Sequence, residues 1–448
     1  MSEPNKVSRR EFVGKTATAG AVGAAVPYFV PARALGQADA PGANDRIGVG
    51  LIGCGGMGRA NLNACAGHPD VAVTAVCDVQ KDRRDATVAQ FKGTAKPYND
   101  YRELLAQNDV DAVIIAPPPH WHALIAVDAC EAGKDIYLQK PMTLYPAESL
   151  AVKRAVEKHG RISQIGTQIH AGANYRRVVE MVRSGNLGKI SVARTFLVMN
   201  QAPGGLGHTP PSDPPPGVDW EMWIGPAPMR PYHAKLAASS GNHCSLWMDY
   251  SGGWTPGMAP HTVDLPYWAL DLGFPLRTSC SGGRSIVTGD GDVPDVQEIL
   301  WQFPDMTLTW MMSLVNAYSF DLQGKSNLGV YFHGVNGTLF ANYGTHQVIP
   351  EGNRMKDLPV PEPSIPPSPG HEREWLNSIK TRQQPSCSVF YHYKIDVALT
   401  LGNLSLKLGR SIAFDPATEK ITGDEEAARL AVPEYRDPWK FPAEYLES

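Results

Sequence analysis

The stretch RIGVGLIGCGGMGRANLNACAGHPDVAVTAVCD, residues 46–78, decides the fold. It begins with a short apolar run, residues 47–52, of the kind that forms a parallel strand covered on both faces. The pattern G-x-G-x-x-G follows at residues 53–58. Its first glycine permits a sharp turn, the second lets backbone amides approach a pyrophosphate, and the third permits close helix–strand packing. The stretch therefore predicts a strand, a nucleotide-binding turn, a helix from near Gly56 and a second strand.

The residues that would hold the nucleotide follow from this pattern. The second strand, residues 71–77, ends in Asp78, 20 residues after the last glycine. A carboxylate there accepts hydrogen bonds from a ribose diol and repels a 2′-phosphate, so NAD is favoured over NADP even with Arg83 and Arg84 nearby. The alternative is a structural βαβ unit without a cofactor. The predicted cofactor-binding residues of this stretch are Gly53, Gly55, Gly56, Met57, Gly58 and Asp78.

Composition limits the class of protein. The chain has 448 residues, a hydrophobic content of 43% and a formal net charge of −4, which describe an ordinary soluble protein of about two or three domains. It contains no basic block, so no nucleic-acid partner is expected. The seven cysteines are odd in number and form no C-x-x-C pair, so neither a metal site nor a disulfide framework is predicted.

The N-terminus has the character of a targeting segment. Residues 8–12, SRREF, are similar to a twin-arginine export signal, and a weakly apolar run rich in Ala and Gly follows at residues 17–30. We interpret residues 1–40 as a twin-arginine signal peptide and linker. The expected partner is the twin-arginine export machinery, and the expected location is the periplasm or another exported compartment. An uncleaved membrane anchor and a disordered tail are the alternatives.

Strand and helix patterns alternate after Asp78 and then change. Strands are expected at 110–116, 135–138 and 161–166, and helices at 81–91, 122–131 and 148–158. A second region begins with a helix at 175–184 and a half-buried strand of an antiparallel sheet at 190–199. Further strands are expected at 298–303, 308–312 and 330–333, and helices at 371–380 and 394–408. The chain is therefore an α/β protein.

Six segments carry a resemblance to a known family. They are PPPHWH (117–122), AGKDIYLQKP (132–141), GTQ (166–168), GNLGKI (185–190), WIGPAP (223–228) and SGGWTPGMAPHTVD (251–264). With the glycine turn, they resemble the Gfo/Idh/MocA family of NAD(P)-dependent sugar and cyclitol oxidoreductases.

This resemblance implies an architecture for the chain. Residues 46–168 would form a Rossmann domain with a doubly wound parallel sheet. Residues 169–448 would form a substrate-binding and oligomerisation α/β domain with a large open, mainly antiparallel sheet, whose C-terminal helices are candidates to pack back on the Rossmann domain. It also implies a homo-oligomer, a dimer or a tetramer.

The family signature E-K-P implies one catalytic residue. Here it reads Gln139-Lys140-Pro141, so the lysine is retained and the acid is not. The resemblance places Lys140 beside the nicotinamide and the substrate hydroxyl, where burial would lower its pKa and let it take or relay a proton. The alternative is a surface lysine.

A second family signature places an acid four residues before a catalytic histidine and another acid three residues after it. This chain has Gly257, His261 and Asp264 at those positions, so His261 is a second catalytic candidate. A packed core histidine is the alternative. The predicted substrate-binding residues are Tyr175, Trp254, His261 and Asp264, and the predicted cofactor contacts at the strand ends are Pro118, His122 and Lys140.

The resemblance implies two activities. The first is NAD-dependent oxidation or reduction of a ring carbon of a sugar, sugar derivative or cyclitol, and it is the one we expect. The second is redox-neutral glycoside hydrolysis, by oxidation, elimination, hydration and reduction around a tightly bound NAD, which suits export of a preloaded protein. A third class, a sugar-binding protein that keeps NAD as a structural part, is disfavoured by the retained Lys140 and His261.

Overall fold

The computed structural model describes residues 42, 45–91, 93–238, 243–320 and 326–447. It separates a short unit that ends at Arg46 from the body of the chain, which begins at Ile47. The segment interpreted as a twin-arginine signal and linker, residues 1–40, lies outside the described residues. Within the described ranges, no helix has both the length and the apolar character needed to cross a membrane.

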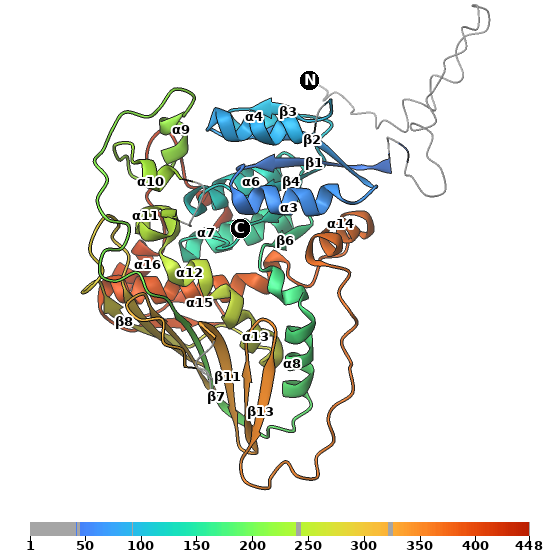
Figure 1. Ribbon diagram of the computed structural model, residues 1–448, viewed down its shortest axis with the longest axis vertical. Helices are drawn as coiled ribbons and strands as arrows, with labels where there is room; N and C mark the ends of the chain where they lie inside the picture. The colour runs from blue at the N-terminus through green and yellow to red at the C-terminus, as the bar shows by residue number, and fades with distance from the viewer. Residues whose placement is uncertain (1–41, 43–44, 92, 239–242, 321–325, 448) are drawn as a thin grey trace, which may run out of the picture. The chain divides into compact units, whose positions relative to one another are not determined.

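Six parallel strands form the first sheet, in the order β3-β2-β1-β4-β5-β6 (Figure 1). The order reverses at the central strand β1, which leaves a crevice beyond the carboxyl ends of β1 and β4. Every residue of β1, β4 and β5 is buried, which explains why these strands are apolar apart from Asp135 at the start of β5. The strands are β1 (Ile47–Ile52), β2 (Val71–Cys77), β3 (Lys96–Tyr98), β4 (Ala112–Ile115), β5 (Asp135–Leu138) and β6 (Ser163–Ile165).

Helices connect these strands. Their bounds are α3 (Gly56–Ala66), α4 (Lys81–Gln90), α5 (Tyr101–Leu105), α6 (His122–Glu131) and α7 (Pro146–Lys158). The doubly wound parallel sheet predicted from the sequence is confirmed, because each strand and helix expected there is present within a few residues of its expected bounds. The sequence patterns missed the short strand β3 and the short helix α5.

Nine strands form the second sheet, in the order β13-β12-β11-β7-β10-β9-β8-β14-β15. They are β7 (Ile190–Val198), β8 (Arg277–Gly283), β9 (Val296–Gln302), β10 (Thr307–Ser313), β11 (Leu328–Gly334), β12 (Gly337–Ala341), β13 (His346–Pro350), β14 (Ile412–Asp415) and β15 (Lys420–Ile421). The predicted mainly antiparallel sheet is confirmed. The expectation for β7 was incomplete, because β7 pairs antiparallel with β11 but parallel with β10.

The long helix α15 (Val389–Leu408) packs against both sheet-bearing regions. Its Ala398 carbonyl accepts a hydrogen bond from the Trp301 indole of β9 at 2.8 Å. Its Asp396 carboxylate accepts hydrogen bonds from Thr143 and Ser149 of the nucleotide-binding region at 2.6 and 2.7 Å. The helix begins five residues before the expected start at residue 394. Opposite faces of one helix thus belong to the two hydrophobic cores.

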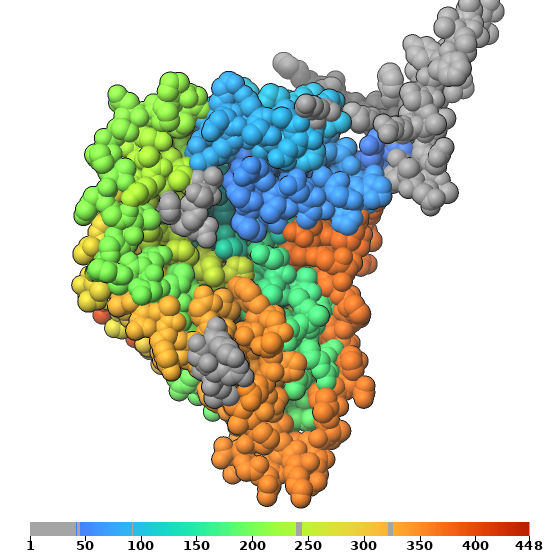
Figure 2. Space-filling model, in the orientation of Figure 1, coloured from blue at the N-terminus to red at the C-terminus, as the bar shows by residue number. Residues whose placement is uncertain are grey.

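A long segment, residues 200–238, runs from the second sheet to the edge of the first; we call it the crossing segment. It contains the short helices α9 (Trp220–Ile224) and α10 (Ala234–Ala237). In Figure 2 its green atoms lie directly against the blue atoms of the nucleotide-binding region. The chain then returns through α11 (Met248–Ser251), α12 (Trp254–Met258) and α13 (Pro260–Leu270). The remaining helices include α8 (Ala173–Arg183), α14 (His371–Thr381) and α16 (Glu425–Leu430).

Candidate active site

The glycine turn after β1 has the shape that a dinucleotide requires. Gly53 has a φ of +92°, and a Cβ there would lie 2.5 Å from the Ala116 backbone. A Cβ on Gly58 would lie 2.1 Å from the Gly53 carbonyl oxygen, so both positions need glycine. By contrast, a Cβ on Gly55 or Gly56 would meet no atom within 4 Å. Bare backbone at the start of α3 therefore faces open space, which fits a pyrophosphate.

Asp78 follows β2 and is tied to that turn. Its Oδ2 atom accepts a hydrogen bond from the Cys54 amide at 2.6 Å, and its Oδ1 atom accepts one from the Gln80 amide at 2.8 Å. Burial raises the pKa of this carboxyl group, while the two backbone donors oppose the increase. Asp78 is thus held in one orientation at the edge of the crevice, where a ribose would lie in a Rossmann fold.

The crossing segment is bonded to the nucleotide-binding region beside Asp78. Backbone hydrogen bonds join Lys81 N to Gly217 O at 2.8 Å and Asp219 N to Val79 O at 2.9 Å. Side-chain bonds add to them: Gln80 Nε2 to Ala237 O at 3.0 Å, Arg83 Nη2 to Ala237 O at 2.7 Å, and Asn99 Nδ2 to Asp219 Oδ2 at 2.9 Å. The segment therefore forms a fixed wall at this end of the crevice.

His122 joins the turns that follow β4 and β5. Its Nδ1 atom lies 2.6 Å from the Pro141 carbonyl oxygen, and its Nε2 atom lies 3.0 Å from the Pro117 carbonyl oxygen. Burial lowers the pKa of His122 to about 4, so the ring is neutral near pH 7. A neutral imidazole has one N–H, and it can donate to only one of these carbonyl groups. The His122 ring thus lies between the turn that carries Lys140 and the turn that carries Pro118, and it sets the distance between them.

Lys140 follows β5 and reaches across the crevice to the other region. Its ammonium group donates a hydrogen bond to the Gly257 carbonyl oxygen at 2.9 Å. Burial lowers the pKa of Lys140 to about 8, although the nearby Cys244 thiol opposes the decrease. The adjacent Gln139 amide donates to Asn61 at 2.7 Å. The lysine can therefore exchange a proton near neutral pH.

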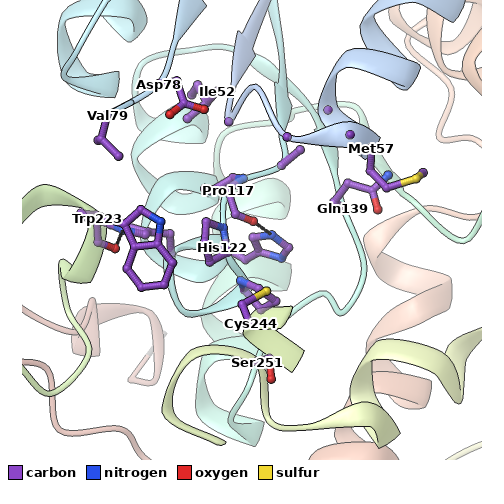
Figure 3. A pocket seen from close by; sticks show the side chains of 18 of the residues that line it. Ile52, Met57, Asp78, Val79, Pro117, His122, Gln139, Trp223, Cys244 and Ser251 are labelled. Atoms are coloured by element: carbon purple, nitrogen blue, oxygen red, sulfur yellow. Dashed lines mark hydrogen bonds between the residues drawn. The ribbon is translucent and has the colours of Figure 1, made fainter. Parts of the chain in front are cut away.

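These groups line one cleft of about 410 Å³. Figure 3 shows Asp78 and Val79 at one end of it, and Cys244 and Ser251 at another. We call the surroundings of Asp78 and Arg83 the Asp78 end, and those of Lys140, Cys244, Trp254 and Gly257 the Lys140 end. The sequence-predicted residues that line the cleft are Gly53, Gly55, Gly56, Met57, Gly58, Asp78, Pro118, His122, Lys140 and Trp254.

Two sequence-predicted residues lie behind the cleft wall. Asp264 is fully buried and accepts hydrogen bonds from His170 and Tyr391, at 3.0 and 2.7 Å. Tyr175 is also fully buried, and its hydroxyl donates to the His261 carbonyl oxygen at 2.6 Å. The structure therefore does not bring Asp264 and Tyr175 to the cleft surface; their substrate-binding roles stay predictions.

His261 also lies outside the residues that line the cleft. It is 6% exposed, and its buried Nδ1 atom has no hydrogen-bond partner among the described residues. Burial, followed by the nearby positive charge of Lys140, lowers the pKa of His261 well below its ordinary value. The ring is therefore neutral near pH 7, and its unpaired nitrogen can take part in a hydrogen bond.

Sequence reasoning missed several lining residues. Met222, Trp223 and Ala237 of the crossing segment line the cleft, as do Cys244 and Ser245. The WIGPAP motif includes Trp223, but nothing in the sequence shows that this motif reaches the nucleotide-binding region. Among the described residues, no group of three or more His, Cys, Asp or Glu side chains could hold a metal ion.

Comparisons with known proteins identify the family. The Gfo/Idh/MocA model for an oxidoreductase family with an NAD-binding Rossmann fold matches residues 47–167. The model for the C-terminal alpha/beta domain of the same oxidoreductase family matches residues 172–275 and 316–441. The chain belongs to the Gfo/Idh/MocA family. The matching model describes an NAD-binding Rossmann fold, and the glycine turn and Asp78 of this chain fit that cofactor.

Curated relatives match about a third of this chain. An inositol 2-dehydrogenase of Salmonella typhimurium is 34% identical over 144 residues, 32% of this chain and 42% of the relative. A glycosyl hydrolase family 109 protein of Shewanella baltica is 30% identical over 154 residues, 33% of this chain and 34% of the relative. The chain thus spans less than half the length of these relatives.

Solved structures match this Gfo/Idh/MocA oxidoreductase over both regions. GenD2 from gentamicin A biosynthesis, in complex with NAD, is 17% identical with a TM-score of 0.61, over 83% of this chain and 97% of that one. Levoglucosan dehydrogenase, in complex with NADH and levoglucosan, is 18% identical with a TM-score of 0.58, over 82% and 99%. At these identities the likeness concerns the fold.

Proposed function

We propose that this protein transfers a hydride between NAD and a ring carbon of a sugar, sugar derivative or cyclitol. One observation carries the proposal: the Lys140 ammonium group, in the same cleft as the glycine turn, crosses from the nucleotide-binding region to the Gly257 carbonyl of the other region. A proton-exchanging group thus lies where both regions meet. The names of the inositol and levoglucosan dehydrogenases among the similar proteins support a carbohydrate or cyclitol substrate.

The cofactor would occupy the cleft along the first sheet. The amides at Gly55 and Gly56 would hold the pyrophosphate, and Asp78 would accept hydrogen bonds from the ribose diol. A 2′-phosphate beside the Asp78 carboxylate would be repelled, so NAD is preferred to NADP. NAD, when bound, supplies the site that takes up or returns the hydride.

Lys140 or His261 would handle the hydroxyl proton. A pKa of about 8 leaves a fraction of Lys140 neutral near pH 7, and a neutral amine accepts a proton. The Nδ1 atom of His261, the second residue of α13, has no partner among the described residues and is the other candidate acceptor. The indole face of Trp254 at the cleft surface would pack on the apolar face of a sugar ring.

The second candidate is a redox-neutral glycoside hydrolase with tightly bound NAD. The family 109 glycosyl hydrolase relative supports it, as does the crossing segment, whose hydrogen bonds beside Asp78 would slow the release of a nucleotide.

Residues 1–40 lead us to propose export of the folded protein by the twin-arginine machinery to the periplasm. The open sheet leads us to propose a homo-oligomer.

The test uses full-length protein purified without added nucleotide. Denaturation and chromatography of the supernatant measure bound NAD(H), and the native protein is then incubated with free sugars, cyclitols and p-nitrophenyl glycosides. NADH formation from added NAD would support the dehydrogenase. Copurified NAD with nitrophenol release and no net NADH would support the hydrolase. Inability to bind NAD, or NAD binding without either reaction across the panel, would contradict the proposed function.

A further inference from the structure

Among the described residues, no carboxylate pairs with the positive charge of Lys140. Its hydrogen bond goes to a backbone carbonyl, that of Gly257, and among the described residues the Cys244 thiol is the titratable group that acts on it. The preceding side chain, Gln139, is a neutral amide already engaged with Asn61 at 2.7 Å. An ammonium group that is half-buried without a counter-charge is costly unless something else supplies one.

The rest of the Lys140 end supplies donors rather than acids. Trp254 lines this end of the cleft, and its indole Nε1, which is buried behind that surface, finds no acceptor among the described residues. Asp78 is the one acid among the described residues that line the cleft, and it belongs to the opposite end. Both of its oxygens already accept backbone hydrogen bonds, from Cys54 and Gln80. The Lys140 end therefore has a cation and a free N–H group but no anion.

Space is available beside the lysine. Gly257 lines the cleft, and a Cβ built on it would meet no atom within 4 Å. This gap adjoins the residue whose carbonyl holds the Lys140 ammonium group. The nicotinamide ring of oxidised NAD carries a positive charge of its own, which adds to that of Lys140 in one poorly solvated cleft.

We propose that the substrate is an acidic sugar, whose carboxylate occupies the space beside Gly257 and pairs with Lys140 while it accepts a hydrogen bond from Trp254. This proposal rests on the proposed function. A carboxylate in this place neutralises the charge of Lys140 and accepts a hydrogen bond from the indole N–H of Trp254. One substrate group would thus provide both missing interactions.

Calorimetry on the NAD-bound protein tests the proposal with matched sugars. D-glucuronate is compared with D-glucose and D-galacturonate with D-galactose, since each pair differs in the C6 carboxylate. The acids are expected to bind roughly tenfold more tightly or better, which is the worth of one charge-assisted hydrogen bond. Glycolate serves as a carboxylate probe without a sugar ring and is expected to bind weakly in competition with the acids.

Three variants connect the preference to Lys140 and Gly257. Lys140→Met should weaken uronate binding about tenfold and so abolish the preference for the acid over the matched neutral sugar. Gly257→Asp should reverse the preference, because an internal carboxylate pairs with Lys140 and fills the gap. Gly257→Asn, of the same size without the charge, should weaken uronate binding and give no gain for neutral sugars. NAD binding to each variant is measured as a control for folding.

Two results would overturn the proposal: neutral sugars that bind as tightly as their acids, or an NAD-bound protein that binds neither uronates nor glycolate. Its failure is separable from that of the proposed function. Oxidation of neutral sugars without a preference for acids contradicts the acidic substrate alone. Lys140-dependent uronate binding with neither NADH nor aglycone release supports the acidic ligand and contradicts the proposed function.

Discussion

The two ends of the cleft differ in how far the chain satisfies its own polar groups. At the Asp78 end, both carboxylate oxygens accept backbone hydrogen bonds, and Arg83 donates to the Ala237 carbonyl. At the Lys140 end, the Trp254 indole has no partner among the described residues, and neither has His261 Nδ1. The Asp78 end is thus preorganised for one constant ligand, whereas the Lys140 end is completed by whatever binds there.

The largest effect is expected from Lys140→Met. Loss of the proton-exchanging group should lower kcat/KM by about 10²- to 10⁴-fold, while the NAD dissociation constant changes little because the Asp78 end is intact. Lys134→Met is the matched control, since Lys134 also donates to backbone carbonyls, of Gln107 and Val110, outside the cleft lining. Steady-state kinetics and NAD titration measure both. An equal decrease of kcat/KM in the two variants would show that Lys140 has no specific role in the proton transfer.

The same variant should be more stable than the wild type at pH 7. Burial lowers the pKa of Lys140 from 10.5 to about 8. The charged form of this group therefore lowers the free energy of unfolding below pH 8. Between these two pKa values the unfolded chain binds more protons, and wild-type stability rises with pH. Denaturant unfolding should show a gain of about 1–3 kcal/mol for Lys140→Met at pH 7 that shrinks toward pH 10. A gain independent of pH would contradict this explanation.

The next effect concerns how kcat/KM of the wild type depends on pH. If free-enzyme Lys140 must be neutral to accept a proton, kcat/KM rises about tenfold per pH unit up to pH 8 and then levels off. Lys140→Met should lose this inflection and keep its residual rate nearly constant. An inflection near pH 6 to 7, unchanged in Lys140→Met, would assign the proton to another group.

Two glycine variants separate packing from binding at the Asp78 end. In Gly58→Ala the new Cβ would lie 2.1 Å from the Gly53 carbonyl, so the turn must shift, at a cost of about 1–3 kcal/mol in unfolding free energy. In Gly55→Ala the Cβ meets no protein atom within 4 Å, so stability should hold while NAD affinity falls about tenfold. Thermal unfolding and NAD titration test both. Equal destabilisation of the two variants would contradict the packing difference.

The smallest effect is expected at the crossing segment. Asn99→Ala removes the 2.9 Å hydrogen bond to Asp219 and should raise the NAD dissociation rate roughly two- to tenfold. Asn186→Ala, which removes an exposed hydrogen bond to the Pro359 carbonyl away from the cleft, is the control. Stopped-flow displacement of NADH measures the rates. No difference between them would mean that this hydrogen bond does not hold the nucleotide in the cleft.

Sequence patterns predicted the Asp78 end better than the Lys140 end, and the reason is physical. Gly53, Gly58 and Asp78 act within one strand–turn–helix–strand unit, so their spacing along the chain determines their spacing in the fold. The Lys140 end joins residues far apart in sequence, such as Lys140 and Gly257. No local pattern reports such a contact.

Two further features, one of the second sheet and one of the candidate site, could not be predicted from local sequence patterns. The parallel pairing of β7 with β10 depends on how distant strands enter the sheet, which alternation of side chains does not encode. Asp264 and Tyr175 carry groups suited to a polyol, yet they bond to His170, Tyr391 and the His261 backbone instead. Residue type indicates what a side chain can bind, whereas burial decides what it meets.

Deuterium transfer tests the central claim most directly. NAD-bound wild-type protein is incubated with a ring-deuterated sugar drawn from those it binds or consumes, quenched early, and the nucleotide is analysed by mass spectrometry. The account predicts deuterium on the nicotinamide ring for either net oxidation or the redox-neutral hydrolysis, and at least about a hundredfold slower transfer with Lys140→Met. Consumption of the sugar without deuterium in the cofactor would contradict it.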